Sequence, residues 1–224
     1  MPAVVAAPAT RPVRVIFDTD MMTDCDDAGA LAVLHALADR GECEILATVV
    51  SVANPWAAAC TDAINTYYGR DDLADVNPNF SRDAVAAHFV VPRWPGAVVF
   101  VGREVASVPS GVKVGANLAK TPMTNPVRLA YRLYHNGADR DRHVADPASV
   151  LFAVRGPRDC WDLSAPGAMD LGPDAKFQWR YDAAGRQRFL RKKIVDGKPN
   201  NAHVERTLDE LMTQAPRTTA KDGR

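Results

Sequence analysis

The chain has 224 residues, a length that suits one domain with short appendages. Hydrophobic residues make up 47% of the chain and charged residues 24%, which is an ordinary globular composition. Lysine plus arginine equal aspartate plus glutamate, 27 of each, so no net field attracts polyanions. The composition therefore excludes nucleic acid and anionic membranes as expected partners.

The cysteines and the start of the chain bear on its compartment. The four cysteines form no Cys-x-x-Cys pair and no zinc-finger spacing, which favours reduced thiols and a cytoplasmic protein. The Ala- and Pro-rich start lacks the basic and apolar regions of a signal peptide, and no apolar run has transmembrane length. A periplasmic or secreted protein would require a mis-assigned start. We expect a disordered stretch at 1–12, one domain at 13–213 and a disordered tail at 214–224.

Apolar runs of strand length alternate with segments of helical periodicity along the chain. In chain order the patterns predict a buried strand at 13–17, a helix at 26–41, a strand at 43–52, helices at 54–69 and 82–91, a strand at 96–102, helices at 125–137 and 146–156, a hairpin at 177–195 and a closing helix at 202–212. This order indicates an α/β fold with a mainly parallel sheet, helices on both faces and a small C-terminal hairpin.

The stretch FDTDMMTDCDDAGAL, residues 17–31, contains five aspartates within ten positions. They are Asp18, Asp20, Asp24, Asp26 and Asp27. Carboxylates this close repel one another, and helix capping accounts for only one or two of them. The cluster follows the first predicted strand, where α/β sheets bind their ligands. We therefore expect a bound cation at this position.

Oxygen ligands favour calcium or magnesium over zinc or copper. An EF-hand loop does not fit the sequence, because Met22, Thr23 and Gly29 stand where that loop needs a polar ligand, glycine and glutamate. A phosphohydrolase of the haloacid-dehalogenase type remains an alternative, with Asp18 as nucleophile and Asp20 as acid/base. That alternative leaves the paired aspartates at 26 and 27 without a role.

The stretch VIFDTDMMTDCDDAGAL resembles the signature of the nucleoside hydrolases, the inosine–uridine-preferring N-ribohydrolase family. In that family a first strand ends in Asp-Thr-Asp and is followed by a paired Asp-Asp and a helix. Further segments are similar in the same order, at 51–70, 77–105 and 146–156. The resemblance covers most of residues 13–213. It implies the fold of that family and hydrolysis of the N-glycosidic bond of ribonucleosides.

The resemblance also implies a set of site residues. One calcium ion would be held by Asp20, Asp27 and Asp146, with Asp20 as the general base that takes a proton from calcium-bound water. The ribose-binding residues would be Asp26, Asn54, Asn77, Asn79 and Asp146. Asp18 would orient the loop from behind these ligands, and Asp24 is expected to be exposed to solvent.

The sequence departs from the family pattern in three places. Only eight residues separate Arg70 from Asn79, so an internal segment with a central strand and a calcium-binding carbonyl is missing. Asn77 stands where the family has a glutamate for the ribose 5′-hydroxyl. Alanine precedes Asp146 where many members have a histidine for the leaving base, and His143 lies two residues before that alanine. We therefore expect weak calcium binding.

These departures keep a second hypothesis open, a relative of the same fold that binds a ribosyl ligand or a partner without catalysis. A small-molecule ribonucleoside is the expected ligand in the first hypothesis. The sequence is also compatible with a homo-oligomer.

Overall fold

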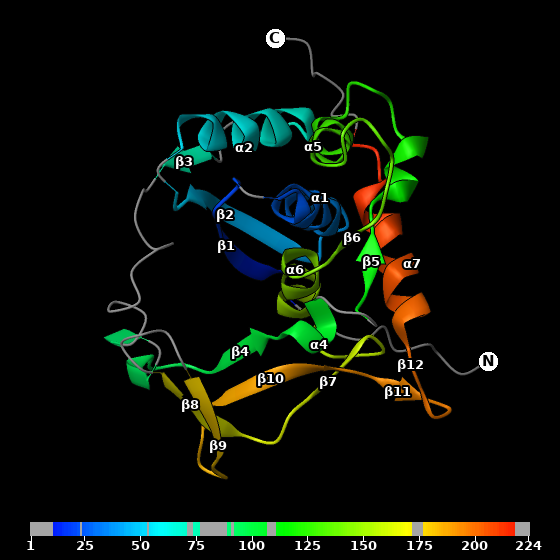
Figure 1. Cartoon of the computed structure of the whole chain (residues 1–224). Coiled ribbons are helices and arrows are strands. Elements are labelled where there is room, and N and C mark those ends of the chain that lie inside the picture. The colour runs from blue at the N-terminus through cyan, green and yellow to red at the C-terminus, as the bar shows by residue number, and fades with distance from the viewer. Residues whose placement is uncertain are drawn as a thin grey trace, which may run out of the picture.

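The computed structural model describes residues 11–22, 24–52, 54–70, 74–76, 89–90, 92–106, 111–171 and 177–217 (Figure 1). Two of the predicted ribose-binding residues, Asn77 and Asn79, and most of the helix predicted at 82–91 lie outside these ranges. The same holds for most of the predicted stretch at 1–12.

The elements follow the predicted order in the first half of the chain. They are β1 (Val13–Thr19), α1 (Asp26–Asp39), β2 (Cys43–Val50), α2 (Pro55–Tyr67), β3 (Ala74–Val76), β4 (Val98–Val101) and α4 (Arg103–Ala106). The second half contains β5 (Lys113–Val114), a 3-10 helix (Ala116–Lys120), α5 (Pro126–Tyr134), β6 (Arg142–His143), α6 (Asp146–Arg155), β7 (Trp161–Leu163), β8 (Gly167–Leu171), β9 (Phe177–Tyr181), β10 (Gln187–Lys192), β11 (Ile194–Val195), β12 (Lys198–Pro199) and α7 (Asn201–Met212). Strand β3 lies in the short connection where we predicted no strand.

The described strands form a mixed α/β architecture. Strands β1, β2 and β3 form a three-stranded parallel sheet, and β4 pairs in parallel with β10. The remaining described pairs, including β10 with β7 and β8 with β9, are antiparallel. The α/β class is confirmed, whereas a mainly parallel sheet is not shown, because most of the described strand pairs are antiparallel. Strands β8, β9 and β10 are joined by short connections, which favour antiparallel pairing over a crossover.

The predicted C-terminal hairpin forms with different partners. Its two strands are present as β9 and β10, but β8 lies between them in the sheet order. Strand β8 pairs with β9 along its length and with β10 at Gly167. Two glycines make this crowded arrangement possible, because a Cβ on Gly185 would lie 2.3 Å from the carbonyl oxygen of Gly167.

Helix α1 lies at the centre of the molecule in Figure 1, between the β1–β2–β3 sheet and helices α5, α6 and α7. Alanine and leucine fill most of the helix, and 13 of its 14 residues are buried. A helix that is apolar all round is typical of a buried position. Helix α1 is therefore the core element, and its first turn carries the paired aspartates.

Strand β1 has one covered face and one exposed face. Phe17 and Thr19 are buried, whereas Arg14, Ile16 and Asp18 are exposed, and Ile16 retains 64% of its accessible surface. The apolar sequence of β1 led us to predict a buried strand, and that prediction is wrong for this face. Such runs are typical of strands covered on both faces, but β1 is the terminal strand of its described sheet.

No helix among the described residues combines the length and apolar character needed to cross a bilayer. The four cysteines are free thiols, as predicted.

Candidate functional site

The acidic loop connects the carboxyl end of β1 to the first turn of α1. Asp18 lies in β1, Asp20 follows it, and both side chains are exposed. Asp26 and Asp27 are the first two residues of α1 and are 5% and 4% exposed. The N-cap residue of α1 is Cys25, which makes no side-chain capping hydrogen bond. The paired aspartates are therefore not capping residues, and they are buried in the first turn of the helix.

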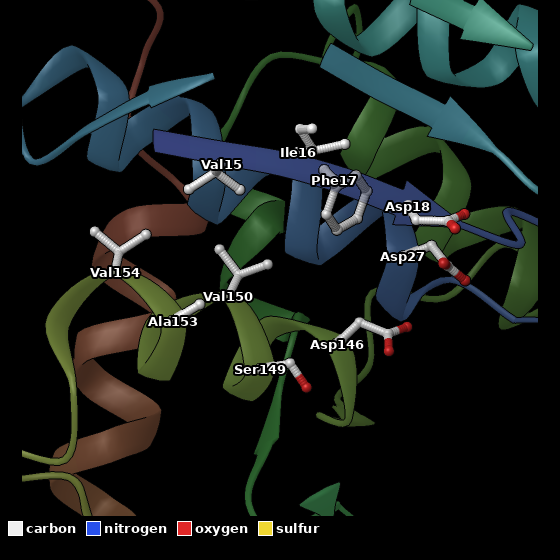
Figure 2. Close-up of a pocket in the computed structure, with 10 residues that line it drawn as sticks. All are labelled: Val15, Ile16, Phe17, Asp18, Asp27, Asp146, Ser149, Val150, Ala153 and Val154. Atoms are coloured by element: carbon white, nitrogen blue, oxygen red, sulfur yellow. The ribbon is translucent and has the colours of Figure 1, made fainter. Parts of the chain in front are cut away.

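A residue far along the chain completes the acidic group. Asp146 is the first residue of α6, which packs against α1. A pocket of about 340 Å³ is lined by Asp18, Asp27 and Asp146 at one end and by apolar side chains of β1 and α6 at the other. Figure 2 shows Asp18 and Asp27 at the carboxyl end of β1, with Asp146 facing them from the start of α6. The structure therefore brings together Asp27 and Asp146, two predicted metal ligands.

The carboxylates of this group resist ionisation. Burial raises the pKa of Asp26 to about 8, and the hydrogen bond with Asp24 and the charge of Asp146 add to this effect. Burial likewise raises the pKa of Asp27 to about 6 and that of Asp146 to about 7, and the negative charge of Asp20 contributes to the rise of both pKa values. A cation would relieve this mutual repulsion.

Asp24 is not the isolated exposed residue that we predicted. Arg142 donates a hydrogen bond from Nη2 to Asp24 Oδ2 at 2.8 Å, and both side chains are mostly buried. Burial would raise the pKa of Asp24, but the hydrogen bonds with Asp26 and Arg142 lower it overall. The prediction was wrong because Arg142 lies far away in the sequence and is brought to the loop by β6.

Two other residues lie close to this part of α1 and were not predicted from the sequence. The Thr19 hydroxyl donates a hydrogen bond to Asp27 Oδ1 and accepts one from the Met21 N–H at 3.2 Å. Tyr131 on α5 is 1% exposed, and its hydroxyl has no hydrogen-bond partner among the described residues. A Cβ on Gly29 would lie 2.4 Å from that hydroxyl, so the glycine makes room for it. Thr19 stands between Asp18, predicted to orient the loop, and Asp20, a predicted ligand, and that position could have marked it.

The remaining predicted residues have different surroundings. Asn54 accepts a hydrogen bond from the Trp56 N–H at 3.0 Å through Oδ1, so it is the N-cap of α2, as its sequence position indicated. His143 is half-buried in β6, and its Nε2 is buried without a hydrogen-bond partner. Burial lowers the pKa of His143, and the neighbouring Lys113 and Arg142 lower it further.

The acidic loop fits a cation. One oxygen from each of Asp24, Asp26 and Asp27 lies within 4.8 Å of the others. Asp26 Oδ2 accepts the Ala145 N–H at 3.3 Å, whereas Oδ1 is buried without a donor. No donor among the described residues reaches that oxygen, and one ionised carboxylate cannot donate to another, so a proton, a water molecule or a cation can satisfy it. The hard oxygen donors suit a divalent ion such as calcium or magnesium.

In comparisons with known proteins, the sequence matches no protein-family model and no curated protein.

Proposed function

We propose that this protein hydrolyses the N-glycosidic bond of ribonucleosides with the help of a bound calcium ion. One observation supports the proposal most directly. Asp27 and Asp146, which are separated by most of the domain in sequence, line one pocket at the carboxyl end of a parallel strand. Carboxylates with raised pKa values in a pocket are candidates for a functional site.

The ligand set in this proposal is Asp20, Asp27 and Asp146, with water as the further ligands. Asp27 also belongs to the group formed with Asp24 and Asp26. Asp24 is already neutralised by Arg142, and Asp26 already accepts a backbone hydrogen bond. The Asp24–Asp26–Asp27 group is the competing ligand set, because one oxygen from each of these residues lies within 4.8 Å of the others.

Each protein group has a task in the reaction. A calcium ion held by Asp20, Asp27 and Asp146 would lower the pKa of a bound water molecule and so make it a better nucleophile. The exposed carboxylate of Asp20 accepts the proton of the attacking water, since no hydrogen bond among those described occupies it. Asp26, Asn54, Asn77 and Asn79 hold ribose hydroxyls. Asp18 lines the pocket and orients the loop.

This function implies a nucleoside-hydrolase type of fold, with a shortened, mainly parallel sheet and helices on both faces. The parallel β1–β2–β3 sheet and the parallel β4–β10 pair support that assignment. The sequence departs most from the family pattern in the part of the site that would contact the nucleobase and protonate it as it leaves.

The direct test is release of free base from purine and pyrimidine ribonucleosides with calcium and with a chelator. We expect calcium-dependent release, and at least a hundredfold loss for Asp20→Asn and Asp27→Asn. Asp162→Asn, at an exposed position of β7, is the matched control and should keep the activity. Absence of base release from every ribonucleoside would reject the proposal in favour of a non-catalytic relative.

A second measurement identifies the ligands. Thermal melts with and without calcium should show a stabilisation that disappears in Asp27→Asn and Asp146→Asn but persists in Asp24→Asn. A calcium stabilisation that persists in Asp146→Asn but disappears in Asp24→Asn would instead assign the ion to the Asp24–Asp26–Asp27 group.

The phosphohydrolase alternative rests on Asp18, which lines the same pocket. Magnesium-dependent phosphate release from a phosphomonoester, lost in Asp18→Asn, would favour it over the glycosidase.

A further inference from the structure

The free edge of β1 borders the apolar half of the pocket. Four consecutive residues of β1, 15–18, line that pocket, although alternate residues of a strand point to opposite faces. The pocket must therefore run along the edge of the strand rather than under one face. Its opposite wall comes from α6, as Figure 2 shows, through Val150, Ala153 and Val154.

The backbone groups on this edge have no strand beside them in the described sheet. The Val13 N–H donates to Glu42 O, and the Thr19 carbonyl accepts from the Ser51 N–H, so both groups point toward β2. Because backbone groups alternate along a strand, Arg14, Ile16 and Asp18 present their N–H and C=O groups to the opposite edge. An edge of this kind is a template for another strand.

The side chains of the same three residues are self-complementary. Arg14, Ile16 and Asp18 lie on the exposed face in the order basic, apolar, acidic. When two copies of this sequence align antiparallel about Ile16, each Arg14 lies opposite the Asp18 of the other copy. The two ion pairs then flank an Ile16–Ile16 contact, and opposite charges in cross-strand pairs are stabilising.

We propose that β1 pairs edge to edge with β1 of a second copy of this chain, in antiparallel orientation, to form a homodimer with Ile16 on its two-fold axis. Such an interface is isologous, which means that the same surface of β1 in each copy forms one half of it. The interface covers the exposed Ile16 and the edge groove. It also places Arg14 of the second copy beside Asp18, at the acidic end of the pocket.

The pattern disfavours the neighbouring registers. A shift of two residues in one direction sets Pro12, which lacks an N–H, against Asp18. A shift in the other direction sets Asp18 against Ile16 and moves Arg14 opposite Asp20, beyond the end of β1, so the register centred on Ile16 keeps both ion pairs within the strand. Arg14 is 3.6 Å from Glu44 in the same copy, but both side chains are more than half exposed. Exposed pairs contribute little, so this contact leaves Arg14 available to Asp18 of the second copy.

Sedimentation of the purified full chain over a wide concentration range tests the proposal. We expect a monomer–dimer equilibrium in the parent. Arg14→Asp and Asp18→Arg each create two like-charge contacts and should raise the dissociation constant at least about tenfold. An equimolar mixture of the two variants should form a heterodimer, because each like-charge pair then becomes an opposite-charge pair.

The controls separate this interface from unfolding and from other surfaces. Leu133→Ser removes an apolar side chain that is 71% exposed on α5 and should leave the equilibrium unchanged. Circular dichroism melts establish that each variant is folded. A parent that stays monomeric at the highest concentration would overturn the proposal. Single variants that dimerise like the parent, or a mixture that stays monomeric, would overturn it as well. None of these outcomes depends on the proposed hydrolase activity.

Discussion

Arg142 and Asp24 are 118 positions apart in the sequence, yet the guanidinium Nη2 lies 2.8 Å from the carboxylate Oδ2. The pair fastens the acidic loop to β6, a strand that precedes the Asp146 end of α6 by two residues. It also supplies a fixed positive charge to a crowded group of carboxylates. Arg142 therefore links the two distant parts of the candidate site.

Arg142→Gln should make the protein depend more on a cation. Loss of the fixed charge leaves the carboxylates less compensated, so we expect the variant to unfold at a lower temperature in chelator, with a loss of about 1–3 kcal/mol. The stabilisation on adding calcium should be larger than in the parent. Calorimetry of both proteins with chelator and with excess calcium measures this. An equal calcium effect in the two proteins would contradict the role given to Arg142.

Calcium stabilisation should depend on pH. The pKa values of Asp27 and Asp146 are raised to about 6 and about 7, so these groups hold protons that the ion must displace. Without the ion, raised carboxylate pKa values mean that stability falls as the pH increases from about 4 toward these values. We expect almost no calcium effect at pH 5 and the largest effect above pH 8, measured by thermal melts. A calcium effect that is constant between these two pH values would refute carboxylate ligation.

His35 should give the opposite pH dependence. Its Nε2 lies 2.8 Å from Asn65 Oδ1, and Nδ1 lies 3.2 Å from Arg70 Nη1. Arg70 can only donate, so Nδ1 accepts and the neutral ring carries its proton on Nε2. Burial lowers the pKa of His35 from 6.5 to about 4, the charge of Arg70 adds to this, and the Asn65 bond and Asp39 oppose it.

A neutral buried histidine contributes stability above pH 6.5 that is lost as the pH falls toward 4, because the unfolded chain binds the proton more readily. His35→Leu should therefore be less stable than the parent near neutrality, with the difference narrowing by up to about 1.4 kcal/mol per pH unit in that window. Urea titrations at several pH values measure the difference. If the stabilities of the parent and the variant change in parallel as the pH falls from 6.5 to 4, His35 does not titrate in that range.

Tyr131→Phe should not destabilise the fold. The hydroxyl is buried without a partner, and removing such a group avoids a desolvation penalty of about 1–3 kcal/mol. We expect unchanged or higher stability in chemical denaturation. Tyr131→Leu, which also changes the ring packing beside Gly29, is the contrasting variant and should destabilise. A large loss in the phenylalanine variant would reveal a partner for the hydroxyl.

Local signals predicted where several helices of the fold begin. Asn54 and Asn125, each followed by proline, cap α2 and α5 through their side chains. The Asp26-Asp27 pair opens α1, and Asp146 opens α6. These features depend on residues close together in the sequence, where capping and periodicity carry the information.

Features set by distant partners escaped prediction. Nothing near Asp24 indicates that Arg142 will reach it. Likewise, the sequence of β9 and β10 fits a simple hairpin, and only the approach of Gly167 to Gly185 explains why β8 lies between them. The exposed Ile16 shows the same limit, because an apolar run specifies a strand but not the number of its neighbours.

The central position of α1 has a consequence for the order of events during synthesis. Gly29 in α1 lies under Met212 of α7, and Leu208 and Leu211 of the same late helix are fully buried. A nascent chain that has produced only α1 and the β1–β2–β3 sheet therefore exposes the apolar surface that α7 later covers. Translation must bring α7 out of the ribosome before this core can close, so the early chain is open to chaperones for most of its elongation.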